Sequence, residues 1–443
     1  MTSPLIPRRR VLQGIALGGG LMMVGGACAP TSRLSPDLRP DPTKPEGTDL
    51  LPQVEHIVIY MQENHSYDSY FGMLKRPGAD GYTFDALGNP TNSNPLAGGG
   101  TVTVHHATDT TVSAHSGQNW SATIREVNGG AMDGFGLQSP DSLQYFTGDD
   151  IPFYYGLANQ FVLCDRWFAS TPCQTHPNRR YLQAGTSAGL IQTDVQKVLA
   201  KPEAPNGTIW DRLNDHGISW QDYCWDLPDI ALFPRVWLSN QSKVKPTQQF
   251  LWDCASGSLP AVSIVSPGTQ AFSEEPTADV QVGEAYSAML INALMQSPAW
   301  DKTVMFFTYD EHGGFYDHVT PPPTVAPDDI APDLEPGDLP GGFDRYGIRV
   351  PSIVISPFAK KDYVSHVVHD HTSILKFIET KWNLGALTRR DAAASDLLDT
   401  LDFDAKAFLD PPVLPAPALP DGVSLLTPGT PALPGPTGGP LHV

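Results

Sequence analysis

Short apolar runs alternate along the chain with amphipathic segments. Strand-like runs, rich in β-branched and aromatic residues, occupy residues 57–61, 261–266, 303–309 and 352–356. Apolar residues with helical spacing occupy residues 151–160, 208–216, 283–297 and 372–382. Short apolar runs favour buried strands, whereas apolar positions three and four residues apart favour helices. The alternation predicts an α/β fold in which a mostly parallel sheet is flanked by helices.

The segments between these elements have their own composition. Residues 29–52 are polar and rich in proline, which is typical of a linker. Residues 81–118 are rich in Gly, Asn, Thr and His, and we expect an irregular excursion over the site. Residues 321–340 form an acidic, proline-rich stretch and are predicted to be a surface loop. Residues 411–443 are a Pro/Gly/Leu-rich tail without a period.

One predicted strand ends abruptly in charged residues. After the apolar run at 303–309 come Asp310 and Glu311, then two glycines, then Asp317 and His318. The carboxyl edge of a parallel sheet is where α/β proteins bind ligands. Two adjacent carboxylates repel each other, so a divalent metal between them is the simplest explanation. The alternative is a solvated loop after an edge strand.

A second strand, residues 57–61, ends in the same kind of chemistry. Glu63 and Asn64 follow it and offer oxygen ligands to a hard cation. The alternative is ordinary turn chemistry, because Asn and Ser favour turns. Two such strand ends, far apart in the sequence, together favour a metal site.

Residues 168–181 are crowded with hydroxyls, proline and arginine. Thr175 lies just before Pro177 and Asn178, and Arg179 follows. Arginine pairs with phosphate oxygens through parallel hydrogen bonds. A hydroxyl becomes a nucleophile only when a base or a metal activates it. Spacing alone favours a loop hydroxyl at Thr175 that bonds to nearby backbone.

Taken in order, these motifs resemble those of the bacterial phosphoesterase family that contains phospholipases C, acid phosphatases and the plant non-specific phospholipases C. The chain has Q-E-N-H-S-Y-D-S-Y-F-G at 62–72 and T-Y-D-E-H-G-G-F-Y-D-H-V at 308–319. Residues 168–181, 347–357 and 369–379 match three further family motifs. The resemblance spans residues 54–385, nearly all of the predicted catalytic domain, residues 53–410.

The resemblance implies a fold and a site. The fold is a three-layer α/β/α sandwich with a mostly parallel central sheet, similar to that of alkaline phosphatases. The family's nucleophilic hydroxyl corresponds to Thr175. The other implied roles are metal ligands at Glu63, Asn64, Asp310 and Glu311, substrate phosphate ligands at Arg179 and Asn178, and catalytic histidines at His318, His369 and His371. The metal is divalent, with Zn, Mn, Fe and Ca all left open.

One departure from the family concerns leaving-group protonation. Many relatives carry two histidines in a His-x-Trp-x-x-x-His pattern, where this chain has Gln118 and Ile124 around Trp120. His115 lies nearby in the sequence. The head-group preference is therefore left open.

The charge of the chain excludes one class of partner. Lys and Arg total 28 against 48 Asp and Glu, which gives a net charge of −20. Loss of a signal containing Arg8, Arg9 and Arg10 would lower this from −20 to −23. Such a surface repels nucleic acids and anionic membranes. A zwitterionic phospholipid or a small phosphoester remains compatible.

Residues 1–28 are predicted to be an export signal. Arg8, Arg9 and Arg10 precede a modest apolar run that ends near Cys28, which is typical of the twin-arginine route. The product would be secreted, periplasmic or a cell-surface lipoprotein. Cleavage before Cys28 would leave a lipid anchor there, whereas plain signal-peptidase cleavage nearby would leave none. A retained N-terminal anchor is a third alternative.

Four further cysteines lie in the exported part of the chain. Cys164, Cys173, Cys224 and Cys254 form an even set, which suits disulfides in an oxidising compartment. We expect bridges from Cys164 to Cys173 and from Cys224 to Cys254, although four cysteines allow three pairings.

The sequence therefore predicts an exported, metal-dependent phosphodiesterase of the phospholipase C type that acts through a phosphothreonine. An acid phosphatase acting on phosphomonoesters is the alternative within the enzyme class. A non-catalytic surface protein that retains the fold is the alternative outside it. The sequence leaves the oligomeric state open.

Overall fold

A computed structural model describes residues 38–111, 117–269, 271–420 and 422–425. The predicted export signal, Cys28 and the end of the tail lie outside these residues. Residues 41–50 run along the end of helix α12 (His371–Trp382), where Gly47 N donates to Trp382 O at 2.9 Å and Leu50 N to Lys381 O at 2.6 Å. Within the described part of the chain, no helix is long and apolar enough to cross a membrane.

An eight-stranded sheet forms the centre of the protein, in the order β13-β6-β12-β11-β1-β10-β8-β9. All neighbouring pairs are parallel except β11–β12 and β12–β6. Only β12 therefore runs against the others, and the prediction of a mostly parallel α/β sheet is confirmed. The strands are β1 His56–Gln62, β6 Val162–Cys164, β8 Trp220–Cys224, β9 Val244–Pro246, β10 Val262–Ser266, β11 Thr303–Tyr309, β12 Ser352–Ile355 and β13 Val364–Ser365.

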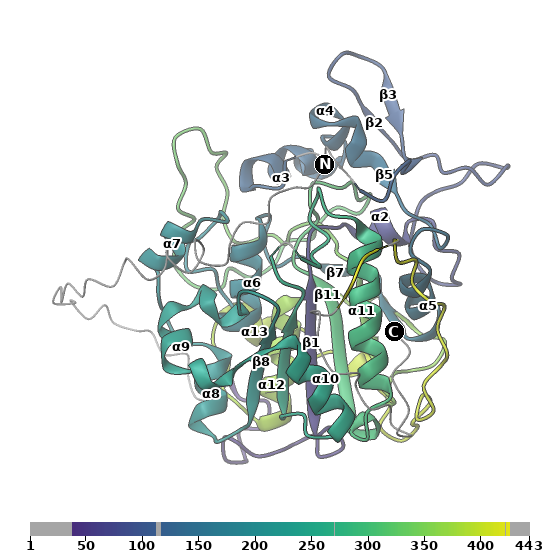
Figure 1. The fold of residues 1–443 in the computed structure, drawn as a ribbon. Helices are drawn as coiled ribbons and strands as arrows, with labels where there is room; N and C mark the ends of the chain where they lie inside the picture. Colours follow the sequence, from purple (N-terminus) through teal and green to yellow (C-terminus); the bar gives the residue numbers. More distant parts are fainter. Residues whose placement is uncertain (1–37, 112–116, 270, 421, 426–443) are drawn as a thin grey trace. The chain divides into compact units, whose positions relative to one another are not determined.

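Helices cover both faces of this sheet, because successive residues of a buried strand point to opposite sides. Phe306 of β11 packs its ring on Phe377 of α12, whereas the next residue, Phe307, stacks on Tyr154 of α5 (Pro152–Gln160). Figure 1 shows α11 in front of the sheet and α12 behind it. The main helices of this part of the fold are α5, α6 Thr175–Ala184, α8 Ile209–Asp215, α10 Thr247–Ser256, α11 Val280–Met295 and α12.

The predicted excursion at residues 81–118 contains short strands that the sequence did not indicate. With its continuation to residue 145, it packs a small apolar cluster, including Tyr82, Phe135 and Leu143, against Tyr316 and Ile348. The segment gathers at one end of the sheet (Figure 1). The remaining short elements are α2 Tyr67–Phe71, α3 Trp120–Val127, α4 Phe135–Gln138, α7 Val195–Ala200, α9 Pro234–Ser239, α13 Arg389–Ala393, β2 Ser93–Pro95, β3 Thr101–Thr103, β4 His105–His106, β5 Gln144–Tyr145, β7 Trp167–Phe168 and β14 His369–Asp370.

The disulfides expected from the sequence are absent. All four cysteines that the structure describes are buried and free. Cys164 packs in the main core, whereas Cys173 packs in a separate cluster with Trp120 and Tyr181. An even count of cysteines says nothing about whether tertiary packing brings the thiols together.

A buried carboxyl group links three elements behind the site. Glu274, between β10 and α11, accepts hydrogen bonds from the phenols of Tyr70, Tyr154 (2.5 Å) and Tyr309 (2.6 Å). Burial raises the pKa of Glu274 to about 7, against the three phenol hydrogen bonds, which favour its charged form.

This raised pKa predicts a pH dependence of stability. Because the unfolded carboxyl titrates near 4.5, the Glu274 contribution is greatest below that pH and is lost as the pH rises through about 7. The loss is of order 3 kcal/mol. In Glu274→Gln the fall in the free energy of unfolding that comes from ionisation of residue 274 should vanish. Urea unfolding at pH 4.5 and 8 would measure the free energy of unfolding of the wild type and of the variant. As the pH rises, the stability of the variant relative to the wild type should increase. A pH-independent ΔΔG would contradict the assignment.

Candidate active site

The two acidic strand ends lie side by side. β1 and β11 are parallel neighbours, and their last paired residues are Gln62 and Tyr309. Glu63 and Asn64 thus leave the sheet next to Asp310 and Glu311. The backbone amide of Asn64 donates to Asp310 Oδ1 at 3.3 Å. The sequence-based expectation that these strand ends meet at one edge is confirmed.

A tight turn beside each strand end explains the local sequence. Asn64 has a φ of +68°, a left-handed conformation that asparagine tolerates better than most residues. Gly313 has a φ of +63°, and a Cβ there would lie 2.0 Å from the carbonyl oxygen of Asn64. A side chain at residue 313 would therefore push the two strand ends apart, which accounts for the first glycine of the Gly-Gly pair.

The four predicted ligands offer the oxygen donors that a hard divalent cation takes. All four side chains are buried, and Asn64 Oδ1 and Glu311 Oε1 have no hydrogen-bond partner among the described residues. Burial raises the pKa of Glu63 to about 8 and that of Glu311 to about 7, and it also raises the pKa of Asp310. A cation would relieve both conditions, because it accepts lone pairs from the two free oxygens and favours ionised carboxylates.

Arg179 lies among these acids at the wall of a pocket. Its Nε donates to Asp310 Oδ2 at 3.0 Å and its Nη1 to Asp229 Oδ1 at 2.9 Å. Its Nη2 lies 3.4 Å from Glu63 Oε1. The sequence assigned Arg179 to the substrate phosphate, but the structure shows a guanidinium whose nitrogens already donate to protein oxygens.

Asn178 has a similar supporting position. Its Oδ1 accepts from Thr171 N at 3.1 Å, and its Nδ2 donates to Cys173 O at 2.8 Å. These bonds shape the loop that leads into Thr175. The side chain predicted to hold phosphate thus holds the loop of the predicted nucleophile.

Thr175 faces a pocket of about 230 Å³. It is the first residue of the ten-residue helix α6. Helix N-termini attract phosphate through free amides and the positive end of the helix dipole. The residues of the wall that bear on the chemistry are Glu63, Gln118, Thr175, His176, Arg179 and Glu275.

The three predicted catalytic histidines do not line this pocket. His371 Nε2 lies 2.8 Å from Asp310 O, and burial lowers the pKa of His371 to about 4, so it is neutral. His369 is buried beside Ser365 and Asp399. His318 contacts Asp68 and Asp80. These residues therefore support the site from behind or lie in a separate network.

The pocket wall contains two polar residues that the sequence did not single out as functional. His176 directly follows Thr175, and burial lowers its pKa to about 4. Glu275 lines the same pocket, and burial raises its pKa. The sequence shows that His176 follows Thr175 and that Glu275 follows Glu274. It does not indicate that both side chains line the pocket.

Gln118 and Ile124, the residues at the two positions where many relatives have histidine, lie in different surroundings. Gln118 lines the pocket and accepts a hydrogen bond from Asn64 Nδ2 at 3.3 Å. Ile124 packs against the apolar cluster of Trp120 instead. Of the two altered positions, only Gln118 contacts a predicted ligand.

Comparisons with known proteins identify the family of this chain. The profile of the family described as "Phosphoesterase family" matches residues 54–385. This chain belongs to the phosphoesterase family. The resemblance drawn from the motifs is thereby confirmed, as is the prediction of a phosphoester hydrolase.

Relatives of this phosphoesterase come from plants and bacteria. Non-specific phospholipase C1 of Arabidopsis thaliana is 32% identical over 379 residues, covering 77% of this chain and 69% of that protein. Phospholipase C B of Mycobacterium tuberculosis is 32% identical over 453 residues, covering 86% and 85%. A solved protein of the alkaline phosphatase superfamily from Vibrio parahaemolyticus matches with a TM-score of 0.36 and 10% identity over 74% of this chain and 77% of its own. That structural likeness is too weak to bear on function.

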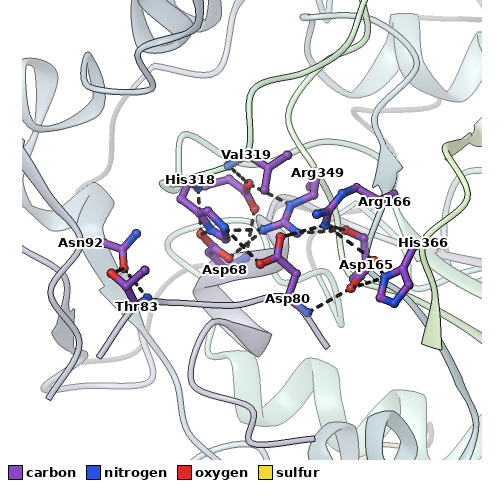
Figure 2. A network of polar contacts seen from close by, with 11 residues as sticks. Asp68, Asp80, Thr83, Asn92, Asp165, Arg166, His318, Val319, Arg349 and His366 are labelled. Carbon is purple, nitrogen blue, oxygen red and sulfur yellow. Dashed lines mark hydrogen bonds and ion pairs between the residues drawn. The ribbon is translucent and has the colours of Figure 1, made fainter. Parts of the chain in front are cut away.

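A second polar cluster of the phosphoesterase surrounds Arg349 (Figure 2). Asp68, Asp317 and His318 each offer a ligand atom, all within 4.8 Å of one another, so by distance the group could bind a metal. In this structure Arg349 already donates to Asp68 Oδ1 and Asp317 Oδ1, both at 2.9 Å. Although burial disfavours its charge, Asp68 raises the pKa of His318 to about 10. Two protein cations thus neutralise these acids.

Proposed function

We propose that this phosphoesterase is an exported, metal-dependent phospholipase C that cleaves phospholipids through a phosphothreonine. The observation that carries the proposal is the pocket that Thr175 shares with Glu63, at the sheet edge where Asn64, Asp310 and Glu311 also lie. The phospholipase C names of its relatives support the substrate class. Export is proposed from the twin-arginine pattern at residues 1–28.

The proposed metal would be held by Glu63, Asn64, Asp310 and Glu311. When bound, it would polarise a phosphoryl oxygen and lower the pKa of a nearby hydroxyl. Thr175 Oγ loses its proton and attacks phosphorus, a P–O bond forms to Thr175, and the bond to the diacylglycerol oxygen breaks. That oxygen takes up a proton and leaves as diacylglycerol. Water then cleaves the Thr175–phosphorus bond and releases the phosphorylated head group.

The start of α6 supports phosphate binding in this scheme. The positive end of the helix dipole stabilises charge on the phosphoryl oxygens. Arg179 keeps Glu63 and Asp310 close by donating to both. Of the titratable side chains of the pocket wall, His176 and Glu275 are the candidates to exchange the proton with the leaving oxygen.

The size of the pocket bears on the substrate. At about 230 Å³ it is smaller than a typical site for a drug-sized ligand. It has room for a phosphate and a small alcohol, and the acyl chains would stay outside. The same size also suits a phosphomonoester, so an acid phosphatase is the second candidate.

Three substrates separate these two functions. We expect the purified protein to release phosphocholine from phosphatidylcholine vesicles, and to hydrolyse p-nitrophenyl phosphorylcholine at least about tenfold faster than p-nitrophenyl phosphate. Tenfold corresponds to about 1.4 kcal/mol of transition-state discrimination. The opposite preference would identify a phosphatase. Hydrolysis of none of the three, with metal bound, would overturn the proposed activity.

A further inference from the structure

Two loops carry the four proposed ligands. The first ligand loop, residues 63–68, follows β1 and includes the first two residues of α2, and the second ligand loop, residues 310–318, follows β11. In both loops the proposed ligands come first. The first loop ends at Asp68, and the second has Asp317 next to its last residue.

The loops bond directly to each other at these far ends. Ser66 Oγ donates to Tyr316 O at 2.7 Å. The amide of Asp68 donates to Asp317 Oδ2 at 3.3 Å, and the amide of His318 donates to Asp68 Oδ2 at 2.8 Å. Each aspartate thus accepts a hydrogen bond from the other loop.

This arrangement brings two like charges together without solvent. Asp68 and Asp317 are both fully buried. Facing carboxylates in such a place repel each other unless a cation lies between them. Arg349, itself fully buried, donates from Nη2 to Asp68 and from Nε to Asp317, both at 2.9 Å. One rigid guanidinium therefore joins the two loops.

Arg349 belongs to neither loop. It precedes β12, and its carbonyl accepts from Tyr67 N at 3.1 Å. Its Nη1 donates to Asp165 O at 2.9 Å, and its guanidinium lies 4.3 Å from the centre of the Tyr67 ring. Figure 2 shows the side chain in the middle of the acidic groups. The main body of the fold thus fixes the point at which both loops are held.

We propose that Arg349 is a positioning residue that holds the two ligand loops in register and thereby sets the metal affinity of the site. This inference rests on the proposed metal site at Glu63, Asn64, Asp310 and Glu311. We call the contact of Arg349 with Asp68 and Asp317 the arginine clamp. His318 supports this clamp, since His318 Nδ1 lies 2.7 Å from Asp68 Oδ2. Arg349 touches neither the pocket nor the ligands, so its effect on catalysis is indirect.

The test compares Arg349→Met with the full-length wild-type protein. Zn²⁺ and Mn²⁺ are titrated separately into chelator-stripped protein by calorimetry. Loss of a group that orients metal ligands weakens binding by roughly 10- to 100-fold, and we expect this for Arg349→Met. In the metal-saturated variant, kcat should fall while KM stays within about twofold, because substrate contacts are unchanged.

Arg76→Met is the matched control. Arg76 is a buried arginine that donates to the backbone carbonyls of Ala158, Phe161 and Tyr363, none of which belongs to a ligand loop. Its loss should lower thermal stability without changing metal affinity. Equal weakening of metal binding in both variants would mean that general destabilisation is the cause, and the positioning role would be overturned.

If Arg349→Met does not fold, Arg349→Lys tests the positioning role of Arg349. Lysine keeps the charge but cannot donate to Asp68 and Asp317 in parallel, so metal binding should still weaken. An unchanged Kd in the lysine variant would overturn the proposal.

Hydrogen exchange separates this inference from the proposed metal site. If the wild-type protein binds neither metal, the proposed function fails, but the clamp can still be tested in metal-free protein. The amide of His318 should then exchange faster in Arg349→Lys than in wild type, because its acceptor Asp68 is released. An unchanged exchange rate of the His318 amide would overturn the proposal that Arg349 holds the two loops together.

Discussion

Replacing Thr175 with valine should lower kcat by at least about a thousandfold while leaving the fold and the bound metal intact. Valine keeps the volume and the β-branching of threonine, so α6 should still begin at residue 175. What it removes is the oxygen that would form the bond to phosphorus. Initial rates on p-nitrophenyl phosphorylcholine, thermal melting and metal content by mass spectrometry check the three parts of this expectation.

Thr171→Val is the matched control for that experiment. Thr171 lies in the same loop and is fully buried, and its hydroxyl contacts the Cys173 thiol at 3.5 Å. The same chemical change there should cost stability but leave kcat within a few-fold. Normal turnover by Thr175→Val would falsify the nucleophile assignment. A covalent phosphate trapped on Thr175 in acid-quenched wild-type protein would support it directly.

Glu311→Gln should remove the metal, and activity with it. The substitution preserves the shape of the side chain but removes the charge at Glu311 Oε1, a buried oxygen with no hydrogen-bond partner in the part of the chain that the structure describes. Divalent cations bind a neutral amide much more weakly than a carboxylate, so metal affinity should drop by at least about 100-fold. Metal content after dialysis and calorimetric titration both measure this loss.

Glu284→Gln provides the comparison. Glu284 is also buried with one free oxygen, but it accepts from Tyr154 N at 3.0 Å and belongs to α11, not to a ligand loop. Burial raises the pKa of Glu284 to about 8, so it is largely neutral at pH 7 and an amide replaces it closely. Metal binding should be unchanged there. If Glu311→Gln retained full metal occupancy, the ligand set would be wrong.

The elements that carry the site were predictable because their patterns are local. β11 begins and ends at Thr303 and Tyr309, as the apolar run indicated. The sequence also showed that two predicted strands end in the same ligand chemistry, whereas the pairing of β1 with β11 came from the structure. Glu63, Asn64, Asp310 and Glu311 could therefore be grouped before any coordinates were known.

Other side chains could not be placed from the sequence, because their environment comes from distant segments. Arg179 had the right chemistry for phosphate, but Asp229 and Asp310 occupy its guanidinium. The cysteines had the right number for disulfides, but Cys164 and Cys173 pack in separate clusters.

By itself, the sequence determined the sheet, the acidic strand ends and the membership of a phosphoesterase family, since these depend on periodicity and on residue order along short stretches. Only the tertiary structure decided which groups face the pocket and which hold the loops. Arg349 and Asp68 are 281 residues apart, yet they bond at 2.9 Å. Such a contact is fixed by the packing of whole strands and helices, and no local pattern encodes it.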